Sequence, residues 1–223
     1  MRVKSWIAIA LGTLICAANV SESQADIVFS NFGPGLSFPV VGRILQGESV
    51  GNIANIDQAA SFINGPSTAF VTDVKLGIYV DSPTNSPFDG RGPLDIIIAS
   101  DAGGLPGAAL HTTSLNPNTY LSQIADASIG GSVQLAPNTK YWIIADAKGT
   151  FDGAWEYTPL NDFGPVAGRS NNGPWNLHNP NDPRLVFQVE ARIAAVPEPG
   201  CMAVLVPGLA AMICNRRRRK RSA

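Results

Sequence analysis

Two stretches of the chain alternate apolar and polar residues with a period of two. In residues 69–80 one face collects Phe70, Thr72, Val74, Leu76, Ile78 and Val80. In residues 184–193 the corresponding face collects Leu185, Phe187, Val189, Ala191 and Ile193. This period is that of a half-buried antiparallel strand, because successive side chains point to opposite faces of a sheet. Both stretches therefore predict strands with one face in a core.

Shorter candidate strands are residues 27–32, 94–99, 128–135 and 141–145. Clusters of Gly, Pro, Asn and Asp separate them, at 64–66, 81–93, 101–107, 116–118 and 161–183. With 22 Gly and 17 Pro, long helices are disfavoured, and residues 58–63 alone suggest one helical turn. Hydrophobic residues make up 45% of the chain, which is enough for a core. We expect an all-β fold over residues 26–195, an antiparallel β-sandwich that is jelly-roll-like.

The first 25 residues have the pattern of a secretory signal peptide. Arg2 and Lys4 supply a positive start, and residues 6–18 form an uncharged apolar run. Ser23 and Ala25 place small residues before a cleavage site after Ala25. The sequence therefore predicts export of the segment that follows.

The last 28 residues contain three features in a fixed order. Val196, Pro197, Glu198 and Pro199 come first, an uncharged stretch follows over 200–215, and residues 216–221 are all basic. This order resembles the PEP-CTERM sorting signal of bacterial surface proteins, which implies an exosortase-type membrane enzyme as a partner. As a helix the uncharged stretch would span about 24 Å, less than the roughly 30 Å hydrocarbon core, so we expect transient membrane insertion before processing.

The segment between these ends is acidic and free of sulfur. It contains 15 Asp and Glu against 8 Lys and Arg, a balance that disfavours nucleic acid as a partner. The cysteines are Cys16, Cys201 and Cys214, so residues 26–195 can form no disulfide, thiolate metal site or cysteine nucleophile. Packing must stabilise this segment.

Two motifs in the middle segment resemble choice-of-anchor domains of bacterial surface proteins. Among these domains, the resemblance is strongest to the R type. Residues 99–107, Ala-Ser-Asp-Ala-Gly-Gly-Leu-Pro-Gly, are similar to a loop of that family. Residues 135–143 look like its turn and following Tyr-Trp strand. The resemblance implies an exported β-rich domain and carries no established activity or functional residue.

Signals for catalysis are weak. Gly47, Ser49 and Gly51 match the G-x-S-x-G elbow, with Asp101 or Asp152 and His178 following in order, but no helix is expected after Ser49 as that mechanism requires. Paired carboxylates such as Asp152 and Glu156 leave a secreted hydrolase as a further alternative. We expect no enzyme, no catalytic residue and no cofactor.

Metal-binding signals are also weak. The two histidines, His111 and His178, match no metal motif, and we expect His178 to be a solvated loop residue. Calcium ligands are conceivable among the acidic loops, at Asp81, Asn85, Asp89, Asp101 and Asp182, without a recognisable calcium loop. We expect solvated acidic turns and no metal site.

Aromatic residues gather in the second half of the segment, at Trp142, Trp155, Tyr157 and Trp175. Flat aromatic rings stack on the C–H faces of sugars, and Asn and Asp bond their hydroxyl groups. The sequence thus supports two functions: a structural or adhesive protein at the cell surface or in the extracellular matrix, or a carbohydrate-binding module for extracellular polysaccharide.

Overall fold

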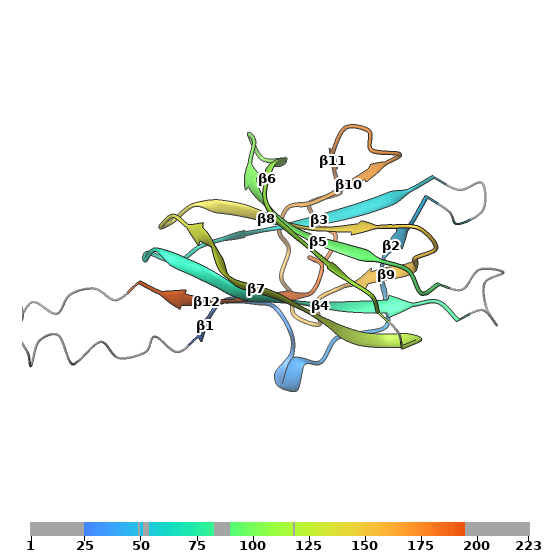
Figure 1. Cartoon of the computed structure of the whole chain (residues 1–223), viewed down its shortest axis with the longest axis horizontal. Helices are drawn as coiled ribbons and strands as arrows, with labels where there is room; N and C mark the ends of the chain where they lie inside the picture. Colours follow the sequence, from blue (N-terminus) through green and yellow to red (C-terminus); the bar gives the residue numbers. More distant parts are fainter. Residues whose placement is uncertain (1–24, 49, 51–53, 83–89, 118, 195–223) are drawn as a thin grey trace, which may run out of the picture. The chain divides into compact units, whose positions relative to one another are not determined.

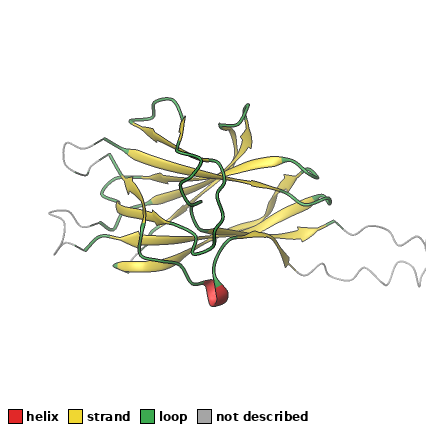
Figure 2. Cartoon of the chain, turned by 180° about the vertical axis from the view of Figure 1, so that it is seen from behind, coloured by secondary structure: helices red, strands yellow, loops and turns green. Residues whose placement is uncertain are grey.

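Strands make up most of the part of the chain that the computed structural model describes, residues 25–48, 50, 54–82, 90–117 and 119–194. They are β1 (Ala25–Ser30), β2 (Gly42–Gln46), β3 (Ile56–Ile63), β4 (Ala69–Val80), β5 (Leu94–Asp101), β6 (Pro106–Leu115), β7 (Leu121–Leu135), β8 (Lys140–Ala147), β9 (Asp152–Glu156), β10 (Val166–Ser170), β11 (Asn176–Leu177) and β12 (Phe187–Ile193). Within these residues the helical structure is one short 3₁₀ turn, Pro34–Leu36, drawn in red in Figure 2. The predicted signal peptide and sorting tail lie outside the described residues, except for Ala25.

The strands pair antiparallel in one sheet that curls into two layers (Figure 1). One layer contains β1, β12, β4 and β7, and the other contains β6, β5, β8, β3 and β10. β9 and β2 connect the layers, because β9 pairs with β4 and β2 pairs with β9 and β3. The predicted all-β antiparallel fold is confirmed, and its layers are parts of one continuous open sheet.

A single apolar core lies between the layers. Phe187 of β12 is its centre, stacked on Phe29 at 4.6 Å between ring centroids and edge-on to Phe62 and Trp155 at 6.0 and 6.1 Å. The inward set predicted for 184–193 is confirmed: Leu185, Phe187, Val189 and Ala191 are fully buried, and Ile193 packs against the core. Burial of such side chains contributes about 1.5–3 kcal/mol each.

A β-bulge in β4 corrects part of the predicted pattern. The ladder to β12 passes from Val71–Ala191 directly to Asp73–Glu190, which leaves Thr72 as an extra residue. The bulge shifts the alternation by one position, so Val71 is buried and Phe70 is only partly buried. The prediction that Phe70 faces the core was therefore wrong, whereas the positions from Val74 to Val80 were right.

The predicted helical turn at 58–63 is also wrong, since these residues belong to β3. β3 is covered on both faces: Ala60 and Phe62 lie in the main core and Ala59 lies in a second apolar cluster. A strand buried on both sides loses the period-two pattern, so its sequence did not reveal it. The loops expected at 101–107 and 161–183 similarly contain the start of β6 and the strands β10 and β11.

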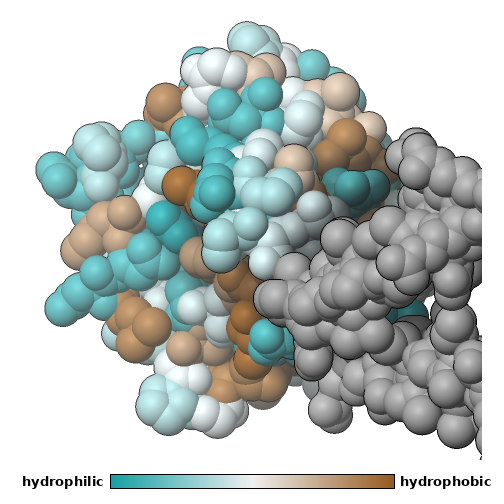
Figure 3. All heavy atoms as spheres, turned by 90° about the vertical axis from the view of Figure 1, so that its left-hand side faces the viewer, coloured by the Kyte–Doolittle hydropathy of each residue, from teal (hydrophilic) through white to brown (hydrophobic). Residues whose placement is uncertain are grey.

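The second apolar cluster lies on the opposite face of the β5–β8–β3–β10 layer. Its buried members are Ala59, Ala99, Trp142, Ile144 and Ala167, and Ile97, Leu105 and Trp175 pack against it. Figure 3 shows one end of the described surface, where hydrophobic and hydrophilic residues are interspersed. Among the described residues no helix has the length and apolarity needed to cross a bilayer. The polar side chains of the candidate site lie on the same sheet face as this outer cluster.

Candidate functional site

A row of charged side chains crosses the outer face of four adjacent strands. Asp95 of β5 pairs with Asp146 of β8, and Asp57 of β3 pairs with Arg169 of β10. The β3–β8 register places Asp57 beside Asp146, one step beyond the Gln58–Ala145 pair. Residues far apart in the sequence thus form one row, which we call the charged row.

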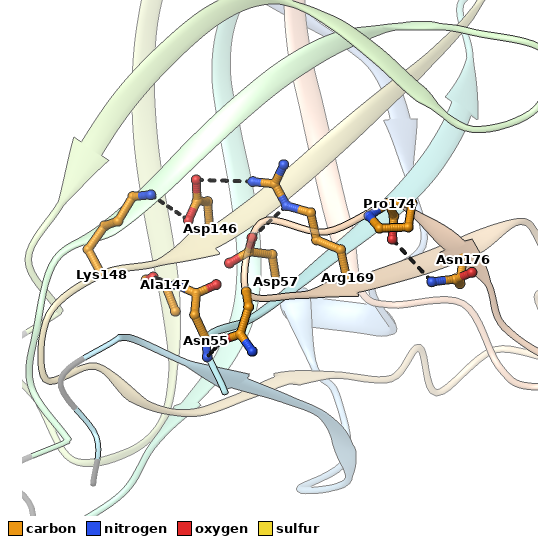
Figure 4. A network of polar contacts seen from close by, with 9 residues as sticks. Asn55, Asp57, Asp146, Ala147, Lys148, Arg169, Pro174 and Asn176 are labelled. Carbon is orange, nitrogen blue, oxygen red and sulfur yellow. Dashed lines mark hydrogen bonds and ion pairs between the residues drawn. The ribbon is translucent and has the colours of Figure 1, made fainter. Parts of the chain in front are cut away.

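Arg169 is the centre of the charged row (Figure 4). Its Nε donates to Asp57 Oδ2 at 2.7 Å, and its terminal nitrogen lies 3.5 Å from Asp146 Oδ2. The guanidinium carbon also lies 4.7 Å from the ring centroid of Trp175, so the ring supports the flat face of the cation. Lys148 Nζ forms an ion pair with Asp146 Oδ1 at 2.7 Å. The guanidinium is therefore fixed on three sides.

The buried carboxyl group of Asp57 has an unusual proton affinity. Burial, together with the charge of Asp146, raises the pKa of Asp57 to about 6 against the opposing hydrogen bond from Arg169. Burial lowers the pKa of Lys148, but its ion pair with Asp146 and the nearby Asp57 and Asp95 outweigh that effect and raise it. The row therefore combines a carboxyl group that holds its proton to a higher pH than usual with an amine whose pKa is raised.

A groove of about 280 Å³ opens at the edge formed by β10 and β11, and the register places most of its side chains on the sheet face opposite to the charged row. It is lined by Ile56, Gln58, Gly168, Arg169, Ser170, Pro174, Asn176 and His178. Gln58 Nε2 donates to the carbonyl of Ile44, so its Oε1 accepts the hydrogen bond from His178 Nε2 at 2.9 Å. Burial, with help from Arg43, lowers the pKa of His178, so the ring is neutral at pH 7. The expected solvated loop histidine is instead half-buried and bonded.

Gly168 makes this contact possible. A Cβ at position 168 would lie 2.7 Å from His178 Nε2 and 3.1 Å from Gln58 Oε1. Any larger residue would therefore push the imidazole away from Gln58. Position 168 therefore requires glycine because His178 and Gln58 approach it closely, and not because its backbone dihedral angles are unusual.

The structure divides the four predicted aromatic residues between two faces of the sheet. Trp142 is fully buried in the outer cluster, where its Nε1 donates to Asp101 at 2.8 Å. Trp155 is fully buried in the main core, where its Nε1 donates to the carbonyl of Val186 at 2.7 Å. Tyr157 is half-buried against the main core. Trp175 is half-buried between the outer cluster and Arg169, and none of the four is among the residues that line the groove.

The remaining candidate residues are dispersed. Asp152 is buried and accepts from Gln46 at 3.2 Å, and Glu156 is fully buried and accepts from Ser122 at 2.9 Å, so neither faces the groove. Asp101 bonds the backbone of Gly104 as well as Trp142, and Asp182 forms an ion pair with Arg43. Ser49, Asn85 and Asp89 lie outside the described residues. Among those described, no three acidic, His or Cys side chains converge as a metal site would require.

The sequence analysis missed Asp57, Asp146 and Arg169. Each sits alone in an apolar or mixed strand, and no spacing links them. The one available signal was a charged residue at a position whose neighbours are buried, such as Asp146 after Trp142-Ile143-Ile144-Ala145. No protein-family model and no curated protein matches the chain.

Proposed function

We propose that the protein is exported and associates with the cell surface or extracellular matrix as a non-catalytic structural or adhesive protein. The observation that carries this proposal is the ordered tail, in which Val196, Pro197, Glu198 and Pro199 precede an apolar stretch and a basic end. An exosortase-type enzyme is the partner that would process this tail. The membrane is engaged through the tail during that step.

The properties of the compact unit Gln24–Ala194 support this proposal. Between the two end segments the chain contains no cysteine, so folding does not depend on the redox state of the compartment. Its stability comes from a core of apolar side chains between the two layers. Such a unit can fold outside the cell without disulfide formation.

Mass spectrometry of the protein produced in a bacterium with an exosortase-type enzyme tests the proposal. We expect a new N-terminus near Asp26 and loss of the basic end. Replacement of Pro197, Glu198 and Pro199 by Ala should leave the tail uncut and the protein in the membrane fraction. A matched control with Ala at Ser222 should be processed normally. Recovery of the full-length chain from the cytosol, uncut at both ends, would refute the proposal.

A second candidate function is the binding of extracellular polysaccharide. Trp142 and Trp155 lie in the interior, so the support for this function comes from the groove at the β10–β11 edge. The groove combines donors, acceptors and apolar surface in one place, as sugar sites do. This candidate is compatible with the first, because an adhesive protein needs a ligand.

A further inference from the structure

We propose that two copies of the protein associate through the free edge of β6, with their β6 strands paired antiparallel about a two-fold axis at Thr113. The partner is a second copy of this chain. This association is additional to the proposed function and does not depend on processing of the tail.

β6 is the last strand of its layer. The strand order ends in β3, β8, β5 and β6, and β6 pairs with β5 along one edge (Figure 1). In the described part of the chain, no ladder joins the other edge of β6 to a strand. The outward N–H and C=O groups of such an edge can pair with a strand of another molecule.

The sequence of β6 lacks the features that usually prevent edge pairing. It reads Pro-Gly-Ala-Ala-Leu-His-Thr-Thr-Ser-Leu and contains no Asp, Glu, Lys or Arg. The other edge strands differ, since β1 has Asp26 and a register shift after Ile27, β7 has Asp126, and β11 has two residues. Charges, bulges and short length all oppose edge pairing, so β6 is the edge most open to it.

The regular part of β6 is short, and it determines the register. The ladder to β5 is interrupted at Leu110, which is an extra residue before His111. Pro117 follows the strand and has no backbone N–H to donate. The regular residues are therefore 111–115, and Thr113 is the middle one. A two-fold axis at Thr113 pairs all five with the same five residues of the second copy.

The side chains that meet across this axis are compatible. Thr112 of each copy lies opposite Ser114 of the other, and Thr113 lies opposite its own equivalent. Thr–Thr and Thr–Ser pairs on neighbouring strands stabilise antiparallel sheets. Thr112 and Ser114 are exposed in the single copy. Asp95 pairs with Ser114 from β5, one strand behind the edge, so no charged residue of β6 meets its equivalent.

The inward side chains of β6 keep their contacts within each copy. Leu115 packs against the main core, and His111 Nδ1 lies 3.2 Å from Ser132 Oγ of β7. Pairing through the free edge would extend the layer sideways, so it requires no exposure of the core.

The contact is small, so the association should be weak. Two five-residue stretches bury less surface than the roughly 1,200 Å² of stable complexes. We expect a Kd on the order of 100 μM in solution. Copies held at one surface have a higher effective concentration, which favours pairing there.

Sedimentation equilibrium tests the inference on the purified protein, with its ends as the exporting bacterium leaves them. Samples from about 1 μM to about 1 mM bracket the expected Kd. We expect monomer at the low end and dimer at the high end.

Paired variants locate the contact. Thr112→Lys with Ser114→Lys brings like charges together at two points across the axis and should weaken the dimer at least tenfold. Ser128→Lys with Gln134→Lys adds the same charge at exposed positions of β7 and should leave Kd unchanged.

A charge-reversal mixture separates lost pairing from misfolding. Thr112→Glu with Ser114→Glu should also be monomeric alone. An equimolar mixture of this variant with the β6 lysine variant should form a mixed dimer at least as tight as that of wild type, because opposite charges then meet across the axis.

The inference is overturned if wild type stays monomeric up to about 1 mM, if the β6 lysine variant dimerises like wild type, or if the mixture stays monomeric. Equal weakening by the β7 control would overturn it too, because the effect would then belong to net charge. A dimer formed by a chain that is neither exported nor cut would contradict the proposed function alone.

Discussion

The pH dependence of stability should depend on Asp57, and Asp57→Asn is the variant that isolates it. Burial raises the pKa of this carboxyl group from 3.8 to about 6 in the folded protein. Between these two pH values the unfolded chain has released the proton, whereas the folded protein still holds it. The unfolded state therefore binds fewer protons, and stability falls as pH rises from about 4 to about 6.

The magnitude follows from the difference between the two pKa values. One pKa unit corresponds to about 1.4 kcal/mol, so Asp57 costs the folded protein up to about 3 kcal/mol above pH 6. This penalty is absent below pH 4, where the carboxyl group is protonated in both states. An asparagine has the same shape and does not titrate. The free energy of unfolding of wild type minus that of Asp57→Asn should therefore fall by up to about 3 kcal/mol over this interval.

Urea unfolding at pH 4, 5, 6 and 7, followed by tryptophan fluorescence, measures this difference. Asp126→Asn is the matched control, since the Asp126 side chain is 54% exposed and its removal should change the pH profile little. A difference that stays constant from pH 4 to pH 7 would show that burial does not hold the proton on Asp57. A difference that rises with pH would show that the Arg169 hydrogen bond outweighs burial.

Three further substitutions test the packing of the sheet. Phe187→Ala removes the ring at the centre of the core and should lower the free energy of unfolding by about 3–5 kcal/mol in urea. Gly153→Ala should destabilise by about 3 kcal/mol in thermal unfolding, because the new Cβ would lie 2.1 Å from the Tyr79 carbonyl oxygen and force β9 away from β4. Glu156→Gln should raise Tm at pH 8 and change it little at pH 4, because burial raises the pKa of Glu156 and an amide avoids the cost of ionisation. Wild-type stability of Phe187→Ala or Gly153→Ala, or an unchanged Tm of Glu156→Gln at pH 8, would contradict the burial described for that residue.

The strands that the sequence predicted well are those with one face in the core and one facing solvent. Residues 184–193 satisfied the first half of that condition, and their inward positions were correct, but Val186 and Gln188 on the other face are buried as well. The inward position of Phe70 was predicted wrongly because a bulge at Thr72 shifts the alternation by one residue, and no local signal distinguishes a bulge from a regular strand. β3 was not predicted as a strand because apolar residues cover both of its faces, which removes the alternation of apolar and polar residues.

The site was less predictable than the fold because its residues come from strands that are distant in the sequence. Asp57, Asp146 and Arg169 come together through the pairing of β3 with β8 and β10. The register between distant strands cannot be predicted from the sequence of any one segment. Tryptophan content suggested an exposed sugar-binding face. In the folded chain the large apolar area of Trp142 and Trp155 is buried in the two clusters. Of the predicted residues, Trp175 contacts Arg169 on the outer face, and none of them lines the groove.

The charged row is expected to contribute little net stability to the sheet face that it covers. Replacing a buried ion pair with apolar residues of similar volume is often neutral or stabilising, because the removal of two charges from water costs free energy. The double variant Asp57→Leu with Arg169→Met should therefore keep the wild-type fold and a free energy of unfolding within about 2 kcal/mol of wild type or above it. Asp57→Leu alone should be clearly less stable, because it leaves the half-buried Arg169 without its closest partner. Urea unfolding of both variants measures the difference. A double variant that is as unstable as the single one would show that the ion pair itself stabilises the fold.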